Sequence, residues 1–437
     1  MKEIRTVAVL GSGTMGTGIA GVCANAGCEV LLLDMDQAAC DKAKQNLTAG
    51  RSPIVKDEAL LANIKTGSFE NDLAAIADAD WICEAIIENV DIKRSMFGKI
   101  EPIRKDGSIL TTNTSGIPLK DIYQGMPERM QQDIAVTHFF NPVHIMKLVE
   151  LVPGENTRPE VIETLGHFLG TTLKKGVVYA KDTVNFIGNR IGCFWMLTGM
   201  NLAEKAMKND GLTIETVDAL MSTPVGFPAT GLYGLIDLIG LDVMYNVGKN
   251  LDINLPADDY GRKFTALTDN VQKLHDQGQL GRKTGGGFYK LTRHDDGSKT
   301  MEVFDITHHH WRDAKPHTLS DSEQSINALF SNDEPNGRFM QDIMATTLCY
   351  TADLVPDISI DIVNVDRAMR WGFGWKKGPF ELIDELGAKT LIDLVNSEGM
   401  GMPKMLQVMI DADESTFYRK NGEEHLGTDG NWHTVSA

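Results

Sequence analysis

Two consecutive apolar segments carry a histidine and a glutamate. His138 stands between Thr137 and Phe139-Phe140-Asn141-Pro142, and Glu150 lies within Lys147–Leu151. Oxidation of an alcohol by hydride transfer needs a base for the hydroxyl proton, and histidine titrates near neutral pH. A carboxylate on the other ring nitrogen would fix the tautomer and stabilise the charged ring. From spacing alone, the sequence is equally compatible with a catalytic pair and with a core histidine beside an unrelated glutamate.

A glycine-rich loop near the N-terminus has the spacing of a dinucleotide-binding turn. It follows the apolar segment Thr6–Leu10 and comprises Gly11, Ser12, Gly13, Thr14, Met15 and Gly16. The first glycine permits a tight turn, the second lets the backbone approach a pyrophosphate, and the third allows close packing of the following helix. Asp34 ends the next apolar segment, where it could bind the adenosine ribose and would repel a 2′-phosphate. NAD is therefore predicted over NADP, with FAD or a turn without a ligand as alternatives.

Alternating strands and helices are expected to position these residues. The predicted strands are Thr6–Leu10, Glu29–Leu33, Trp81–Ile87, Ser108–Thr112, Ile134–Phe140, Leu148–Val152 and Gly176–Ala180. The helical patterns between them include Asp72–Ala77, Ile92–Ile103 and Pro159–Leu169. This alternation predicts a doubly wound, Rossmann-type α/β sheet, whose strand carboxyl ends form the binding edge.

Beyond Asp182 we expect helices and no further strands. One long helix is predicted over 185–208, the segment 294–336 reads as polar and irregular, and 422–437 reads as a linker-like tail. The predicted domains are an NAD-binding domain (1–183), a first helical domain (184–292), a linker (293–336) and a second helical domain with a polar tail (337–437).

An internal repeat relates the two helical regions. Val217-Asp218 matches Val365-Asp366, and Gly231-(x4)-Ile236-Asp237-(x2)-Gly240 matches Gly378-(x4)-Ile383-Asp384-(x2)-Gly387. Between these blocks, Gly226-Phe227 is aligned with Gly372-Phe373. The agreement predicts a duplicated helical unit, with chance similarity of two glycine-rich stretches as the alternative.

The composition of the chain argues against several classes of protein. The chain has 437 residues and a formal net charge of −18, which argues against a nucleic-acid binder and against a membrane-surface protein. No apolar run approaches the ~18 residues of a membrane span. Six cysteines without a Cys-x-x-Cys pair indicate reduced thiols and a cytoplasmic protein. The run His308-His309-His310 is expected to be exposed, no metal site is predicted, and its role is left open.

Several motifs in this order resemble one enzyme family. They are GSGTMG at 11–16, EAIIEN at 84–89, NTS at 113–115, HFFNPVHIMKLVELVPG at 138–154, FIGNR at 186–190 and KTGGGFY at 283–289. Over its first 290 positions the chain resembles the L-3-hydroxyacyl-CoA dehydrogenases of fatty-acid β-oxidation. The resemblance implies oxidation of an L-3-hydroxyacyl-CoA to the 3-ketoacyl-CoA with NAD.

The resemblance also implies roles for single residues. His138 matches the general base and Glu150 the acid that orients it, while Ser115 and Asn189 match residues that hold the reacting oxygen and the nicotinamide end. Asn141 matches a supporting residue near the substrate. The positions that match the lining of the NAD site are Glu88, Lys93 and Lys283.

The chain departs from the family pattern before the long helix. Val184-Asn185 stands where the family commonly has Pro-Gly, so Asn185 is a rival to Asn189. The second helical copy resembles the tandem domains of multifunctional β-oxidation proteins, which implies association or fusion with an enoyl-CoA hydratase. A homodimer, as in the family, is left open because one copy could replace a partner's helical domain. The alternatives are a dehydrogenase of another 3-hydroxy acid, such as a sugar acid, and a non-catalytic NAD-binding scaffold.

Overall fold

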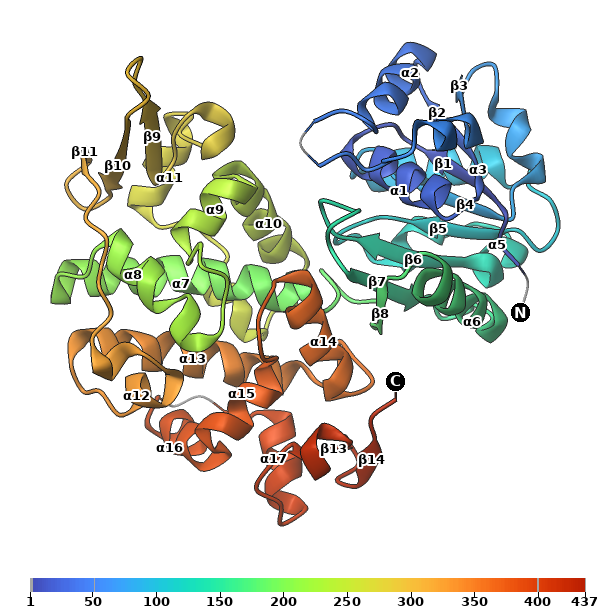
Figure 1. Cartoon of the computed structure of the whole chain (residues 1–437). Coiled ribbons are helices and arrows are strands. Elements are labelled where there is room, and N and C mark those ends of the chain that lie inside the picture. Colours follow the sequence, from blue (N-terminus) through green and yellow to red (C-terminus); the bar gives the residue numbers. More distant parts are fainter. Residues whose placement is uncertain (1–2, 51, 399–400, 437) are drawn as a thin grey trace. The chain divides into compact units, whose positions relative to one another are not determined.

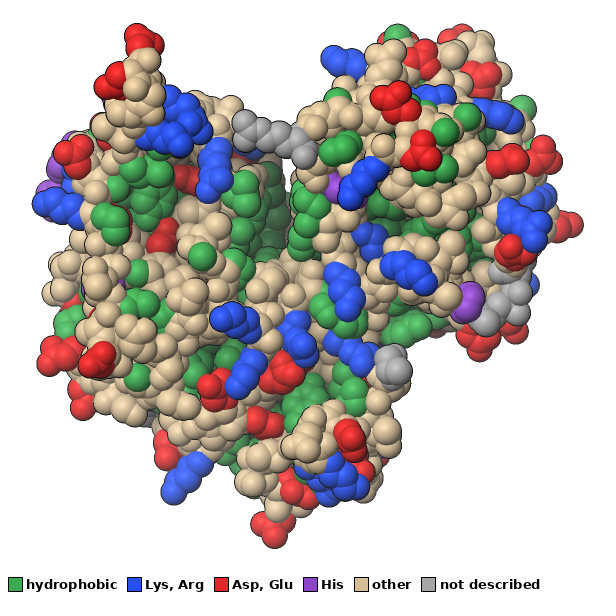
Figure 2. All heavy atoms as spheres, in the orientation of Figure 1, with side chains coloured by type: hydrophobic (Ala, Val, Ile, Leu, Met, Phe, Trp, Pro, Cys, Tyr) green, Lys and Arg blue, Asp and Glu red, His purple; other side chains and the backbone are tan. Residues whose placement is uncertain are grey.

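A computed structural model describes residues 3–50, 52–398 and 401–436, and these residues form two compact units (Figure 1). The first unit runs to Ile187 and includes Asp357–Ile360, and the second comprises Gly188–Pro356 and the chain from Asp361 onward. Acidic and basic side chains lie side by side on the face that Figure 2 shows. Among the described helices, none has both the length and the apolar character needed to cross a membrane.

The first unit is built on an eight-stranded sheet of order β3-β2-β1-β4-β5-β6-β7-β8. Neighbouring strands are parallel except β6 and β7, which are antiparallel. The strands are β1 (Thr6–Leu10), β2 (Glu29–Asp34), β3 (Ile64–Ser68), β4 (Trp81–Glu84), β5 (Ile109–Thr112), β6 (Ile134–Phe139), β7 (Leu148–Pro153) and β8 (Gly176–Tyr179). The order reverses beside β1, which is the switch point of a Rossmann-type sheet. The predicted fold class is confirmed.

Helices flank this sheet. They are α1 (Thr14–Asn25), α2 (Gln37–Asn46), α3 (Val90–Ile100), α4 (Leu119–Tyr123), α5 (Glu128–Asp133) and α6 (Pro159–His167), with 3-10 turns at Glu58–Asn63 and Leu73–Asp78 and a π turn at Phe168–Thr172. Apolar side chains of α1 and α6 share one core cluster with strand residues such as Val9 and Leu151, because these strands are buried on both faces. At the far edge, Lys181 N–H donates to the Ile358 carbonyl at 2.9 Å and Ala180 bridges to Ser359.

Two local predictions, one in this unit and one where the second unit begins, differ from the structure. Strand β3 was missed because Lys65 is exposed and Gly67 lies in its interior, so its apolar pattern is weak. The long helix was predicted to begin at Asn185, but α7 begins at Gly188. Asn185 and Phe186 have φ values of +62° and +49°, which are incompatible with a right-handed helix.

The second unit is mainly helical. Its helices are α7 (Gly188–Asp210), α8 (Ile214–Leu220), α9 (Tyr233–Ile239), α10 (Leu241–Asn254), α11 (Asp269–Asp276), α12 (Ile326–Phe330), α13 (Pro335–Leu354), α14 (Ile362–Gly372), α15 (Pro379–Leu386), α16 (Ala388–Glu398) and α17 (Lys404–Asp411). The long helices α7 and α13 pack side by side (Figure 1).

Two small antiparallel sheets correct the expectation that strands stop after Asp182. One comprises β9 (Tyr289–Arg293), β10 (Lys299–Asp305) and β11 (His310–Asp313), and the other β12 (Tyr418–Arg419), β13 (Glu424–Leu426) and β14 (Trp432–Thr434). The segment 293–336 is thus not an irregular linker, and 422–436 is folded rather than a loose tail. Both polar stretches contain an Asp-Gly turn, at Asp296-Gly297 and Asp429-Gly430, with positive φ at each glycine. An Asp-Gly turn of this kind is a sequence signal for a β-hairpin, although the polar residues around it led to the prediction of loops.

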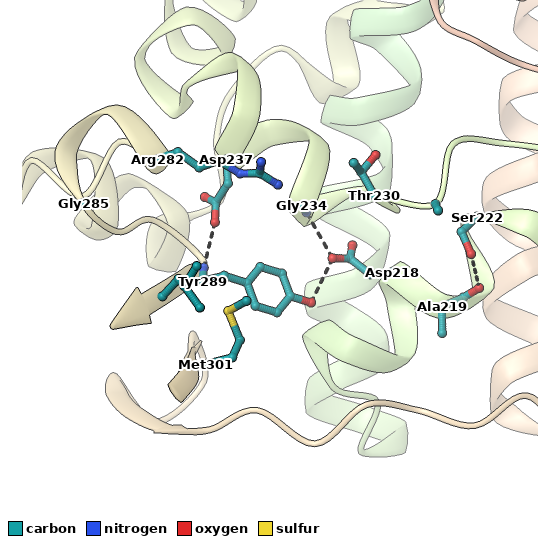
Figure 3. Close-up of a pocket in the computed structure, with 12 residues that line it drawn as sticks. Asp218, Ala219, Ser222, Thr230, Gly234, Asp237, Arg282, Gly285, Tyr289 and Met301 are labelled. Carbon is teal, nitrogen blue, oxygen red and sulfur yellow. Dashed lines mark hydrogen bonds between the residues drawn. The ribbon is translucent and has the colours of Figure 1, made fainter. Parts of the chain in front are cut away.

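A buried aspartate clamp recurs in both helical copies. In the first copy, Asp218 accepts hydrogen bonds from the Gly234 N–H and from the Tyr289 hydroxyl, at 3.0 and 2.9 Å (Figure 3). It also accepts a hydrogen bond from the Tyr233 N–H at 2.6 Å. Asp237 accepts from the Phe288 and Tyr289 N–H groups at 2.8 and 2.7 Å. The clamp borders a cavity of about 590 Å³.

The second copy repeats the clamp. Asp366 accepts from the Phe380 and Glu381 N–H groups and the Tyr418 hydroxyl at 2.8, 3.2 and 2.8 Å. Asp384 accepts from the Phe417 and Tyr418 N–H groups at 2.6 and 2.8 Å. The two copies of the predicted helical unit therefore make the same internal contacts, with Asp366 in the place of Asp218 and Asp384 in the place of Asp237.

The repeat explains why glycine stands at 231 and 378, and its shared contacts continue into the two small sheets. A Cβ on Gly231 would lie 2.4 Å from Asp218 Cα, and one on Gly378 would lie 2.3 Å from Asp366 Cβ, so only glycine fits at either position. Phe304 N–H donates to the Phe288 carbonyl at 2.8 Å, just as Leu426 N–H donates to the Phe417 carbonyl at 2.8 Å. A cation also lies over a tryptophan in each sheet: Lys290 over Trp311 and Arg419 over Trp432.

One part of the predicted repeat alignment was wrong. Gly226 has a left-handed φ of +75°, and the residue that shares this conformation in the second copy is Gly374, at +70°, rather than Gly372. Phe227 therefore corresponds to Trp375 and not to Phe373. These two rings stack on each other with centroids 3.9 Å apart, where the two copies meet.

Candidate active site

His138 and Glu150 are brought together by strand register. They face each other across the antiparallel pair β6–β7, and side chains of directly opposed residues lie on the same side of a sheet. His138 Nδ1 lies 2.6 Å from Glu150 Oε2, and both side chains are almost completely buried. The two side chains are therefore in direct contact, and their catalytic role stays a prediction.

The second carboxylate oxygen of Glu150 is held from the turn before α7. Ile187 N–H donates to Glu150 Oε1 at 2.9 Å. The left-handed Asn185-Phe186 pair aims this N–H at the carboxylate, and asparagine tolerates that conformation better than most residues. This accounts for the departure from the family pattern, because Asn185 stands where glycine is common. The Phe186 and Phe140 rings lie 5.9 and 4.5 Å from the His138 ring.

The loops after β4 and β5 are tied together by charged side chains. Glu88 Oε1 accepts from the Thr114 hydroxyl at 2.6 Å and from the Ser115 N–H at 2.9 Å. Its other oxygen lies 3.2 Å from Lys93 Nζ. The predicted residues Glu88, Lys93 and Ser115 therefore form one connected group, in which Ser115 is exposed and Lys93 is buried.

The glycine-rich loop has the features that a pyrophosphate requires. A Cβ on Gly16 would lie 1.9 Å from the Gly11 carbonyl oxygen, and Gly11 itself has a φ of +108°. A Cβ on Gly13 would have no atom within 4 Å, so the backbone there is open to a ligand. Gly13 caps α1 without a side-chain hydrogen bond, which leaves the positive helix end accessible to an anion.

Asp34 lies beside this loop, as the cofactor prediction requires. Its Oδ2 accepts hydrogen bonds from the Ser12 N–H and hydroxyl at 2.5 and 2.7 Å. The carboxylate thus stands at the end of β2, next to the turn, where a ribose hydroxyl could donate to it. The remaining loop residues, Thr14 and Met15, open α1. The residues present fit a dinucleotide without a 2′-phosphate.

Three predicted site residues lie apart from this group. Asn141 is exposed and joined to Pro142 by a cis peptide bond. Asn189, in the first turn of α7, and Lys283 belong to the second unit, and their approach to His138 and to the cofactor stays a prediction. Lys283 Nζ is paired with Asp242 at 2.5 Å. Among the described residues, no group of three or more His, Cys, Asp or Glu side chains could hold a metal ion.

Comparison with known proteins decides the family. The model of the 3-hydroxyacyl-CoA dehydrogenase NAD-binding domain matches residues 6–183, and that of the C-terminal domain matches residues 186–291 and 337–424. The chain belongs to the 3-hydroxyacyl-CoA dehydrogenase family. The matched NAD-binding domain also confirms NAD as the cofactor of this fold.

Relatives of the chain include longer proteins. A probable 3-hydroxyacyl-CoA dehydrogenase of Bacillus subtilis is 33% identical over 96% of this chain and 56% of its own length. A putative fatty acid oxidation complex trifunctional enzyme of Rickettsia felis is 36% identical over 87% of this chain and 53% of its own length. The crystal structure of 3-hydroxybutyryl-CoA dehydrogenase from Escherichia coli K12 has a TM-score of 0.71 at 25% identity and covers 93% of this chain and 98% of its own. The chain spans about half the length of the two curated relatives.

Sequence reasoning missed several residues that support the site, two of them within the family motifs. Glu84 accepts from Lys93 Nζ at 2.7 Å and from the Thr112 hydroxyl at 2.6 Å. The Asn113 side-chain oxygen accepts from the Phe139 N–H at 2.9 Å and so ties β5 to the residue after His138. Lys175 donates to the Val143 and Met146 carbonyls and holds the loop after β6. The sequence signal for Glu84 was a carboxylate at the end of an otherwise apolar strand, where burial requires a partner.

Proposed function

We propose that this chain is an NAD-dependent dehydrogenase that interconverts L-3-hydroxyacyl-CoA and 3-ketoacyl-CoA in fatty-acid oxidation. The observation that carries the proposal is the buried 2.6 Å contact between His138 and Glu150 at the carboxyl end of the sheet. The NAD-binding glycine loop lies at the same edge. The relatives' names, which specify 3-hydroxyacyl-CoA or 3-hydroxybutyryl-CoA, support a thioester substrate over a sugar acid.

In this proposal His138 is the general base. The Glu150 carboxylate accepts a hydrogen bond from His138 Nδ1–H, which leaves Nε2 with a lone pair to take the substrate's hydroxyl proton. The charged ring that results is stabilised by the adjacent carboxylate, which is itself held by the Ile187 N–H. NAD held by the glycine-rich loop would supply the acceptor for the hydride that leaves C3 of the substrate. In the reverse direction His138 returns its proton to the carbonyl oxygen.

Other residues bind and orient in this proposal. The loop at Gly11–Gly16 would hold the pyrophosphate and Asp34 the adenosine ribose, and Glu88 and Lys93 would line the NAD site. Ser115 and Asn189 would position the reacting oxygen and the nicotinamide end, with Asn141 in support. Lys283 would also line the NAD site. The assignments of the glycine-rich loop and Asp34 rest on glycine spacing and on the place of Asp34 at the end of β2, and the others rest on the family resemblance.

Acetoacetyl-CoA and NADH test the proposal. Wild-type protein should oxidise NADH, and His138→Gln should lower kcat about a thousandfold because the base is lost while the fold is kept. His144→Gln, in the following loop, is the matched control and should keep wild-type turnover. Activity that survives in His138→Gln would remove this residue from the mechanism. No turnover with any acyl-CoA would favour a sugar-acid substrate or a non-catalytic NAD-binding scaffold.

The wider setting is also proposed. Because a relative is named a fatty acid oxidation complex trifunctional enzyme, we expect an enoyl-CoA hydratase to be fused to this chain or associated with it, in the cytoplasm. Co-purification from native extract, assayed for crotonyl-CoA hydration, tests this expectation. Light scattering distinguishes a homodimer from a monomer in which the second helical copy takes the place of a partner's.

A further inference from the structure

The carboxyl ends of β4 and β5 are joined by one buried glutamate. Glu84 is the last residue of β4 and is fully buried. Glu84 Oε1 accepts from Lys93 Nζ and from the Ile86 N–H, both at 2.7 Å, and Oε2 accepts from the Thr112 hydroxyl at 2.6 Å. Each oxygen of this carboxylate is thus bound, and the donors come from α3, from the loop after β4 and from β5.

Glu84 lies on the same side of the sheet as His138. Glu84 is in register with Thr112, and Thr112 is in register with Val136, so the three side chains share one face. His138 is two residues further along β6 and therefore points to that face as well. Glu84 lies level with Val136, two residues before His138 on β6, and is therefore deeper in the sheet than the histidine.

Two carboxylates share the single ammonium of Lys93. Its Nζ lies 2.7 Å from Glu84 and 3.2 Å from Glu88, and the lysine side chain is 1% exposed whereas that of Glu88 is 44% exposed. Glu88 in turn binds the Thr114 hydroxyl and the Ser115 N–H. A chain of contacts therefore runs from buried Glu84 through Lys93 to Glu88 and Ser115 at the surface.

We infer that Glu84 is a positioning residue for the NAD site, acting through Lys93 on Glu88 and Ser115. Without the Glu84 charge, the ammonium has Glu88 as its remaining carboxylate and is drawn toward it, so the loops after β4 and β5 lose their common anchor. The inference rests on the proposed function, in which Glu88 and Ser115 serve the cofactor and the substrate. Burial also raises the pKa of Glu84, and the ammonium opposes that effect.

The experiment uses NADH binding, followed by fluorescence without turnover, beside thermal unfolding. Glu84→Gln keeps the shape and removes the charge, and we expect a roughly tenfold higher Kd for NADH and a lower Tm. In Glu84→Gln/Lys93→Met no buried charge is left unpaired, so Tm should recover. Because Glu84 acts through Lys93, the Kd of the double variant for NADH should equal that of Lys93→Met alone, and a further rise in Kd would overturn the inference.

A buried ion pair at the opposite end of the same sheet supplies the matched control. Asp133, just before β6, lies 2.8 Å from Arg104, and both side chains are buried. Asp133→Asn should lower Tm and leave the Kd for NADH unchanged. If it weakens NADH binding as much as Glu84→Gln does, the effect is general loosening of the sheet and the inference fails.

A milder variant keeps the test decisive if Glu84→Gln does not fold. Thr112→Val removes one of the donors to Glu84, and we expect about a threefold higher Kd for NADH with Tm nearly unchanged. An unchanged Kd in this variant contradicts the inference. Because binding is measured without turnover, absence of acetoacetyl-CoA reduction by the wild type would count against the proposed function and leave this result intact.

Discussion

The two helical copies keep the same clamp but differ in the loop that the clamp holds. In both copies, two aspartates bind the backbone of a Phe-Tyr pair and the tyrosine hydroxyl. In the first copy, Gly285-Gly286-Gly287 precede this pair, and Gly287 has no room for a Cβ, which would lie 2.1 Å from Asp237 Oδ1. In the second copy, Glu414-Ser415-Thr416 stand there. The shared contacts therefore build the fold, and the glycine-rich loop belongs to the first copy alone.

The clefts beside the clamps have also diverged. The first copy's cavity has one basic residue, Arg282, in its lining, beside small neutral residues such as Ala219 and Ser222. The corresponding cleft of the second copy, about 570 Å³, is lined by Arg367, Arg370 and Lys377. The Lys283–Asp242 pair has no counterpart at the matching positions, which are Ala412 and Lys389. Duplication thus preserved the buried polar contacts while the surface around them changed.

The largest effect is expected where the copies meet. Trp375 is 3% exposed, stacks on Phe227 at 3.9 Å and lies 5.8 Å from the Trp195 ring. Trp375→Ala should lower the free energy of unfolding by about 3–5 kcal/mol through the cavity it creates. Because the stack joins both copies, calorimetry should show one transition that moves as a whole. Two transitions, of which one keeps its wild-type Tm, would mean that the copies unfold independently. The control is Trp371→Ala at a half-buried tryptophan, which should lower the free energy of unfolding by less.

The clamps should contribute equally to stability. Asp218→Asn and Asp366→Asn each replace an acceptor oxygen with an amide that faces N–H donors. Each should lower the free energy of unfolding by about 1–3 kcal/mol, because a buried donor then loses its acceptor. Urea denaturation of the two single variants measures this. If one substitution lowers the free energy of unfolding strongly and the other does not, the two clamps are not equivalent.

The pH dependence of stability should also match between copies. Burial raises the pKa of Asp237 to about 6 and that of Asp384 to about 6. In the unfolded chain an aspartate titrates near 4, so between these values the folded state binds more protons and stability falls as pH rises. Relative to Asp237→Asn or Asp384→Asn, the wild type should lose up to ~1.4 kcal/mol per pH unit for each group from about pH 4 to about pH 6. Urea midpoints across this range test the claim, and a difference that does not vary with pH would refute it.

The smallest change in stability is expected at Lys283. Its pair with Asp242 is nearly half exposed, so Lys283→Gln should change the free energy of unfolding by less than about 1 kcal/mol. If this loop contacts the cofactor, the Kd for NADH should nevertheless rise severalfold. Lys377→Gln, which disrupts a half-exposed pair with Glu385 in the second copy, is the matched control and should leave NADH binding unchanged. Equal effects of the two variants would remove the functional distinction between the copies.

Features that depend on residues close together in the chain were predicted well, and features that depend on distant residues were not. The strand Thr6–Leu10 and the loop from Gly11 to Gly16 were predicted correctly because apolar runs and glycine spacing are local signals. The strands of the two small sheets were missed because they are short and polar and are stabilised by pairing with one another. Their Asp-Gly turns were the available signal.

Sequence alone determined the Rossmann-type class, NAD as the cofactor and the existence of a duplicated helical unit, because each depends on residue type at fixed spacing. Tertiary structure decided that His138 faces Glu150, since a shift of one residue between β6 and β7 would turn one of the two side chains to the other face. It also decided that Glu84, Lys93 and Glu88 form one group, because these contacts join segments whose approach depends on how α3 packs beside the sheet.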